Sequence, residues 1–445
     1  MVSHSGHPSP DCAQRKSGAH NHRRPDVERE FARPMSMGPG LFAARSLGNG
    51  RKVGRRALLG GGLAALSFPV FAFGQAHATD KRLLVVILRG GMDGLSALAP
   101  IGDPSYASAR GRLALARTGD NAALALDDTF ALNAALPNMH ALYRAGELLP
   151  IHACATAYRE RSHFDAQNVL ESGAPAPFAR TEGWLNKALG ALPNSRPEMG
   201  LALSAQAPLI LRGPTNVATW SPSGLPDVDS DTMARLLALY QARDPALAHA
   251  LDTAMSANAI AMDAGAGDMG RGGPRSIAPI AQIAARFLKD ESGPIAAVIE
   301  TSGWDTHANQ GIEQGPLARA LRSLDDGLDA FKQEMGAAWA NTVVIVATEF
   351  GRTVAPNGAM GTDHGTGAAA FLAGGAVRGG RVLADWPGLA SSALYEGRDL
   401  RPTIDLRGVF KGVLADHLRI SNAALERDAF PDSGSVRGIQ GLLRA

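Results

Sequence analysis

The sequence repeats one arrangement three times: an apolar run typical of a buried strand is followed by a glycine-containing loop and by carboxylates or histidines. The runs are 83–88, 296–300 and 342–348, and the polar residues after them are Asp93, Asp305, His307, Glu349, Asp363 and His364. Because ligands collect at the carboxyl ends of strands in an open parallel sheet, we expect these side chains to face one site. Carboxylates combined with imidazoles are the ligands that Zn²⁺, Mn²⁺ or Fe prefers, which predicts a divalent metal.

Two histidines carry the strongest indication of metal binding. Asp305 and His307 lie two residues apart, so both side chains point to the same side of an extended segment. His364 follows Asp363 in a loop with glycine at 361, 365 and 367, where the backbone can approach a ligand closely. We therefore expect Asp305, His307 and His364 to be ligands.

Glu349 ends the most hydrophobic predicted strand, and Arg352 follows three residues later. A carboxylate at this position could bind a metal, and the arginine could hold an anionic substrate through paired hydrogen bonds. A structural Glu–Arg ion pair is the alternative that the sequence leaves open.

Ser162 stands immediately before a predicted helix that runs from about residue 164 to 171. Its hydroxyl could cap that helix, with Asp165 completing a capping box. It could instead be a nucleophile activated by a metal and by the positive end of the helix, with Arg159 and Arg161 holding an anion beside it. Both interpretations remain open at this point.

The elements that would position these residues alternate between strands and helices. Residues 316–340 form a predicted amphipathic helix that leads directly into the strand at 343–347. Such alternation predicts an α/β fold, a doubly wound and mostly parallel sheet with helices on both faces. We expect residues 79–445 to form one domain.

The first 78 residues have the pattern of a leader. An arginine pair, Arg55-Arg56, precedes a short apolar run that ends at Ala76-His-Ala78. This pattern predicts a Tat signal peptide, export by the Tat translocase and a periplasmic or secreted protein. The run is too short and too glycine-rich to predict a stable membrane span.

The charge of the rest of the chain argues against nucleic acid as a partner. After residue 78 there are 33 Lys and Arg against 38 Asp and Glu, and no basic run follows the leader. Cys154 is the single cysteine of that part, so an intrachain disulfide is not expected.

The motifs together resemble a known family. The segments RGGMDGL, HFDAQ, GWDTH, TEFGR and DHGTG, after a Tat leader, are similar to those of the exported family called domain of unknown function 1501. They also resemble the alkaline phosphatase superfamily, in which an α/β sheet binds two metals and a hydroxyl nucleophile. In this chain Asp93 lies several residues beyond its strand. Glu349-Phe350-Gly351 stands where that superfamily has Asp-His-Gly, so the resemblance implies that a histidine of the second metal is missing unless Asp363 or His163 replaces it.

The resemblance implies a metal-dependent hydrolase of phosphate or sulfate esters that acts on an anionic small molecule or polymer. One metal, Zn²⁺ or Mn²⁺, would be held by Asp305, His307 and His364, and a second one by Asp93 and Glu349 with Asp363 as a further candidate. Ser162 would attack with the help of Arg352. The alternative is a non-catalytic periplasmic binding or assembly protein that keeps the fold.

Overall fold

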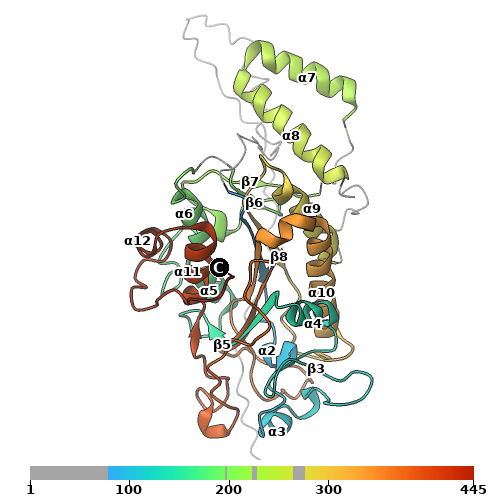
Figure 1. Ribbon diagram of the computed structural model, residues 1–445, viewed down its shortest axis with the longest axis vertical. Helices are drawn as coiled ribbons and strands as arrows, with labels where there is room; N and C mark the ends of the chain where they lie inside the picture. The colour runs from blue at the N-terminus through green and yellow to red at the C-terminus, as the bar shows by residue number, and fades with distance from the viewer. Residues whose placement is uncertain (1–78, 196–197, 223–227, 264–275, 445) are drawn as a thin grey trace, which may run out of the picture. The chain divides into compact units, whose positions relative to one another are not determined.

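The computed structural model describes residues 79–195, 198–222, 228–263 and 276–444 (Figure 1). The predicted export signal lies outside these residues and stays a prediction. Within the described part of the chain, no helix is long and apolar enough to cross a membrane.

Eight strands form the main sheet, in the order β11-β5-β10-β9-β1-β8-β6-β7. The five strands from β9 to β7 run parallel, whereas β10 is antiparallel to both β9 and β5. The predicted α/β fold with a mostly parallel sheet is confirmed. The strands are β1 (Arg82–Leu88), β5 (Leu148–Ala155), β6 (Gly200–Ala202), β7 (Ala218–Thr219), β8 (Ala296–Thr301), β9 (Thr342–Thr348), β10 (Ala368–Ala373) and β11 (Ile404–Asp405).

Helices cover both faces of this sheet, because alternate side chains of its central strands point to opposite sides. Leu84 and Val86 of β1 belong to one apolar core, and Leu83 and Val85 belong to the other. In Figure 1 the helices of the two cores lie on opposite sides of the strands. The first core takes α4 (Pro137–Arg144), α9 (Ala278–Lys289) and α10 (Pro316–Met335), and the second takes α5 (His163–Ser172), α6 (Trp184–Gly190) and α11 (Leu406–Leu418).

The remaining elements are short or lie beside the sheet. A three-stranded sheet has the order β2-β4-β3, and α7 packs against α8, which also contacts α9. The strands and α-helices are β2 (Leu98–Ala99), β3 (Leu124–Ala125), β4 (Ala131–Leu132), α2 (Gly94–Ala97), α3 (Tyr106–Arg110), α7 (Ser230–Arg243), α8 (Pro245–Asp263) and α12 (Asn422–Ala424). The 3₁₀ and π turns are Gly111–Leu113, Leu209–Leu211, Gly336–Asn341, Ser391–Ala393 and Leu425–Ala429.

The long predicted helix at 316–340 is confirmed as α10, but it ends at Met335. Gly336 has a φ of 53°, which a residue with a Cβ rarely adopts, so the α-helix stops and a 3₁₀ turn follows. The apolar face of α10 is buried against the sheet as its spacing predicts; its members are Leu317, Leu321, Leu324, Leu328 and Phe331.

His152 on β5 is fully buried and is held in its neutral form. Its Nε2 lies 2.8 Å from the Leu98 carbonyl, to which it donates, and its Nδ1 accepts from the Ala153 N–H at 2.7 Å. If Nδ1 also carried a proton, that proton would point at the N–H of Ala153, so the doubly protonated ring is unfavourable. Burial lowers the pKa of His152 to about 4.

We expect this histidine to make the fold sensitive to acid. Between pH 6.5 and 4 the unfolded chain binds a proton on His152 that the folded chain does not, so the free energy of unfolding falls as the pH falls. At pH 5 the loss is about 2 kcal/mol relative to pH 7. Urea unfolding of wild type and His152→Gln at both pH values measures it, and equal pH dependence in the two proteins would contradict the prediction. The comparison between variants is needed because Asp325, whose pKa burial raises to about 6, acts in the opposite direction.

Candidate metal centre

The loops after β1, β8 and β9 meet because these three strands are neighbours and end at the same level. Leu88 of β1 pairs with Thr301 of β8 on one side and with Thr348 of β9 on the other. The loops approach so closely that a Cβ on Gly90 would lie 2.6 Å from the backbone nitrogen of Asp305. The amino end of α5 joins this edge through His163.

Three ligand-type atoms form a small triangle at this edge. The Nε2 atoms of His307 and His364 lie 2.9 Å apart, and Oδ1 of Asp305 lies 3.0 Å from the first and 3.4 Å from the second. A tetrahedral zinc ion with bonds of about 2.0–2.1 Å holds its ligand atoms about 3.3–3.4 Å apart. The triangle therefore has the dimensions of one metal-binding face.

A fourth side chain, His163, points to the same place. Its Nδ1 lies 2.7 Å from Oε1 of Glu349, and its Nε2 lies 3.5 Å from Oδ2 of Asp305. This Nε2 atom is buried and has no hydrogen-bond partner among the residues that the structure describes. Buried polar atoms are rarely left without a partner. An unpaired imidazole nitrogen that faces a carboxylate and other histidines is therefore a candidate metal ligand. His163, Asp305 and His364 each offer a ligand atom, and these atoms lie within 4.8 Å of one another.

The sequence-based ligand set did not include His163. It stands one residue after Ser162, at the start of a predicted helix, and no predicted strand directly precedes it. The signal available was the histidine itself at the first position of a helix, next to the predicted nucleophile.

Glu349, predicted as a ligand, is buried; protein donors surround its Oε1, and its Oε2 lies 3.0 Å from the hydroxyl of Thr348. Its Oε1 accepts from the Gly90 N–H at 2.8 Å, from Gln167 at 3.0 Å and from His163. Burial opposes its ionisation, but the hydrogen bonds from His163 and Gln167 outweigh that effect and lower its pKa. The contacts fit a residue that orients His163, in the manner of carboxylates behind metal-binding histidines.

Asp363 stands in the same relation to His307. Its Oδ1 lies 3.3 Å from Nδ1 of His307 and accepts from Asn357 at 3.0 Å. The hydrogen bond from Asn357 lowers the pKa of this exposed carboxylate. Asp363 is therefore beside the ring of His307, on the side away from the nitrogen that faces His364 and Asp305.

Asp93 lies in a different network. Its carboxylate caps α2, accepting from the amides of Leu95 and Ser96, and it forms a buried ion pair with Arg110. Gln310 donates to the same carboxylate at 2.6 Å. Asp93 starts a helix instead of extending β1, and both of its carboxylate oxygens accept hydrogen bonds from these partners. None of the partners belongs to the cluster that is formed by His163, Asp305, His307 and His364.

Arg352, predicted to hold a substrate, has a completely buried side chain. Its guanidinium donates to the carbonyls of the loops after β1, β8 and β9, and to Oδ1 of Asp305. Burial raises the pKa of Asp305, but the hydrogen bond and charge of Arg352 outweigh it and lower that pKa. The arginine ties three loops together and fixes Asp305, and it offers no free face to a substrate. Its carbonyl partners are those of Gly90, Gly91, Trp304 and Thr362.

Ser162 is the N-cap residue of α5, yet its side chain makes no capping hydrogen bond. The capping box that the sequence offered as one alternative is absent too, because Asp165 accepts from the hydroxyl of Tyr158 at 3.0 Å. The hydroxyl of Ser162 is half-buried and stands next to His163 in the chain. Of the neighbouring arginines, Arg161 is bound by two carboxylates and Arg159 by backbone carbonyls.

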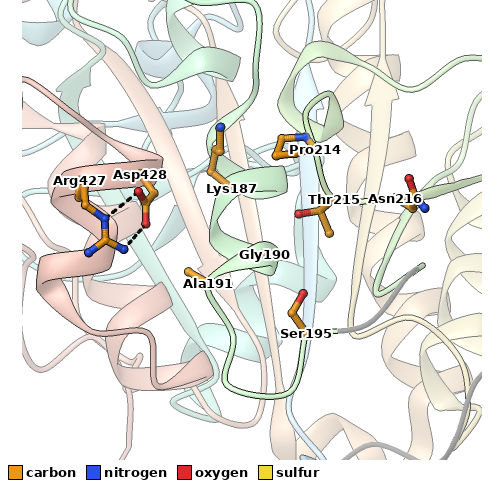
Figure 2. Close-up of a pocket in the computed structure, with 9 residues that line it drawn as sticks. All are labelled: Lys187, Gly190, Ala191, Ser195, Pro214, Thr215, Asn216, Arg427 and Asp428. Carbon is orange, nitrogen blue, oxygen red and sulfur yellow. Dashed lines mark hydrogen bonds and ion pairs between the residues drawn. The ribbon is translucent and has the colours of Figure 1, made fainter.

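The hollow drawn in Figure 2, with a volume of about 540 Å³, lies apart from these residues. It is lined by Lys187, Gly190, Ala191, Ser195, Pro214, Thr215, Asn216, Arg427 and Asp428. Both of its cations are already paired, Lys187 with Glu182 at 2.6 Å and Arg427 with Asp428 at 2.6 Å. The hollow therefore offers no free charge to an anionic ligand.

Known proteins give little direct guidance to the chemistry. No curated protein matches the chain significantly. Ps i-CgsB in complex with k-i-k-neocarrahexaose is similar over 79% of this chain and 74% of its own, at 9% identity and a TM-score of 0.39. The C-terminal periplasmic domain of EcEptC from Escherichia coli, in complex with Zn, is similar over 69% and 76%, at 10% identity and a TM-score of 0.33. The phosphonate monoester hydrolase of Agrobacterium radiobacter is similar over 77% and 74%, at 10% identity and a TM-score of 0.32. At these scores the likeness assigns no reaction to this chain.

One family model covers most of the described chain. The model with the description "Protein of unknown function (DUF1501)" matches residues 152–428. This range contains Ser162 and all four residues of the cluster, whereas Asp93 and its partner Arg110 lie before it.

Proposed function

Since the chain belongs to the family described as Protein of unknown function (DUF1501), whose description names no reaction, we propose a function from the site: hydrolysis of phosphate or sulfate esters with one divalent metal. The observation that carries the proposal is the unpaired, buried Nε2 of His163, aimed at the triangle of Asp305, His307 and His364. Three imidazoles and one carboxylate suit Zn²⁺ better than Mn²⁺.

We propose one metal and not two because the two acids predicted as the main ligands of a second metal already have protein partners. Asp93 is paired with Arg110, and Oε1 of Glu349 accepts from three donors. Oδ1 of Asp305, the oxygen that faces His307 and His364, also accepts from the permanently charged guanidinium of Arg352, so this carboxylate already balances one cation and is not expected to hold two metals as well. His163, Asp305, His307 and His364 would hold the single ion.

In the proposed reaction Ser162 is the nucleophile. Its oxygen forms a bond to the phosphorus or sulfur of the ester while the bond to the leaving oxygen breaks, and the serine proton ends on the leaving alcohol. Water then releases the anion and restores the hydroxyl. The amino end of α5, where Ser162 lies, favours the negative charge of the transferred group. When bound, the metal would polarise the ester oxygens and lower the pKa of the attacking hydroxyl.

A second candidate function is metal-dependent binding without turnover. The sequence suggested three arginines that could bind an anion, and all three are engaged within the protein. Arg352 is buried, Arg161 is bound by carboxylates and Arg159 is bound by backbone carbonyls. This arrangement favours the second function. Under this alternative the metal site is kept, and only the chemistry at Ser162 is missing.

Ser162→Ala separates the two functions. We expect the zinc-loaded wild type to hydrolyse an aryl phosphate or an aryl sulfate and the variant to lose activity by orders of magnitude, because the covalent step needs the hydroxyl. Zinc content should stay the same, and stability should change little because no capping bond is lost. Gel-purified proteins are assayed on both esters with zinc measured in parallel. Retained turnover in the variant would remove Ser162 from the mechanism, and zinc-loaded wild type without turnover on either ester would favour the binding function.

We also propose that the protein works outside the cytoplasm after Tat export. Lysine at both positions of the pair Arg55-Arg56 is expected to leave uncleaved precursor in the cytoplasm, since the pair is the recognised part of such signals. Fractionation followed by immunoblotting detects the precursor and the shorter exported form. Equal export of the double variant and the wild type would refute this route.

A further inference from the structure

We propose that Asp399, a completely buried carboxylate outside the predicted ligand set, positions His364 for metal binding through two arginines. The inference rests on the metal site of the proposed function and not on turnover. Asp399 lies in the loop before β11, and its Oδ1 and Oδ2 atoms each accept from a different arginine. Each of these arginines in turn contacts His364.

The first connection reaches the imidazole ring. Asp399 accepts from Nε of Arg161 at 2.8 Å, and the backbone carbonyl of Arg161 lies 2.9 Å from Nδ1 of His364. A carbonyl can only accept, so this Nδ1 carries the proton and donates it. The lone pair is thereby left on Nε2, the atom that faces His307 and Asp305.

The backbone of Arg161 explains why a side-chain anchor is needed. Arg161 has a φ of 66°, a left-handed conformation that is unfavourable for a residue with a Cβ. Such a conformation persists where the surroundings hold it. Here the side chain is held by Asp399 and Glu396, and the conformation turns the carbonyl toward His364.

The second connection reaches the backbone of the same histidine. Asp399 accepts from Nε of Arg398 at 2.8 Å, and the guanidinium of Arg398 donates to the carbonyl of His364. One buried carboxylate thus fixes His364 at its ring and at its main chain. Loss of this carboxylate would leave two arginines without their buried partner and the ring free to turn.

Zinc affinity of a matched set of variants tests this role. We expect Asp399→Asn to weaken zinc binding roughly 10- to 100-fold, the range for residues that support metal ligands. Arg161→Ala, which keeps the Cβ but loses the anchor, should weaken it similarly. Arg161→Gly should bind zinc more tightly than Arg161→Ala, because glycine adopts positive φ without cost and still supplies the carbonyl. Glu396→Gln serves as the control, since Glu396 is an exposed partner of the same arginine.

Titration calorimetry with zinc alone gives the affinities, and nitrogen-detected NMR of the metal-free proteins gives the tautomer of His364. The expected spectrum has the proton on Nδ1 in wild type and a mixture of tautomers in Asp399→Asn. Zinc affinity of Asp399→Asn equal to that of Glu396→Gln would overturn the proposal, as would equal affinities of Arg161→Ala and Arg161→Gly. If Asp399→Asn does not fold, the Arg161 pair decides. Absence of zinc binding in the wild type would refute the proposed metal site itself. An unchanged tautomer of His364 in the variants would overturn the positioning role separately.

Discussion

His364→Ala is expected to leave the protein almost free of zinc under conditions in which the wild type keeps about one equivalent per chain. The reason is geometric: His364 supplies one corner of the triangle with Asp305 and His307, and its Nε2 is already freed for a metal by the hydrogen bond of Nδ1. Removing a ligand should weaken binding more than the roughly 100-fold that loss of a supporting residue causes. Mass spectrometry of the metal content after dialysis against a weak chelator measures the effect.

The matched control is His140→Ala. His140 lies on α4, and its ring contacts the carbonyl of Ala125 at 3.0 Å, away from the site. A second measurement comes from stability, because zinc at about 100 times its dissociation constant should raise the free energy of unfolding by about 2.7 kcal/mol. That increase should appear in wild type and in His140→Ala but not in His364→Ala. Equal zinc content in the two alanine variants would rule out His364 as a ligand.

Arg110→Met is expected to be the most destabilising of the substitutions considered, at about 3–5 kcal/mol. Arg110 and Asp93 are both buried, and the guanidinium is the charge that balances the carboxylate. Burial opposes ionisation of Asp93, but Arg110 and the hydrogen bonds of Ser96 and Gln310 outweigh it and lower the pKa of Asp93. Without Arg110 the folded protein must keep a buried charge without its cation or bind a proton. Urea unfolding at pH 7 measures the change.

The double variant Asp93→Asn/Arg110→Met is the control for this argument. Because it removes both charges, it should recover a large part of the lost stability. Asp93→Asn alone should keep the wild-type zinc content if Asp93 is structural. A cost below about 1 kcal/mol for Arg110→Met, in the range of an exposed ion pair, would contradict the prediction, and loss of zinc in Asp93→Asn would return Asp93 to the ligand set.

The sequence predicted the fold well because its signals are local. The apolar runs at 83–88 and 342–348 became β1 and β9, and the spacing of leucines on α10 selected the face that packs on the sheet. Strands that alternate with helices of this kind have few arrangements other than a doubly wound sheet. The prediction placed the end of α10 at residue 340, but the helix ends at Met335 because Gly336 adopts a positive φ. The spacing of apolar residues gives no information about this change of backbone conformation.

The residues after β8 and β9 were placed together correctly as a group, since strands that end at one edge bring their loops together. Asp305, His307 and His364 contact one another, and Asp363 contacts His307. Their chemical roles as ligands stay predictions. The same rule does not report partners: Asp93 and Glu349 follow strands of the same edge, but Asp93 pairs with Arg110 and Glu349 with His163.

Local sequence patterns therefore predict which segments become strands and helices and which loops share the carboxyl edge, because backbone conformation and burial pattern depend on nearby residues. Tertiary packing alone decided which partner each polar side chain takes. His163 meets Glu349 across 186 residues of sequence, and Arg161 meets Asp399 across 238. Asp93 lies beside Arg110 and away from the histidines, so it forms a structural ion pair, whereas Asp305 lies beside both Arg352 and the imidazoles of His307 and His364 and is a metal-binding candidate. That choice is made by contacts between distant segments, which neither the type nor the spacing of residues along the chain contains.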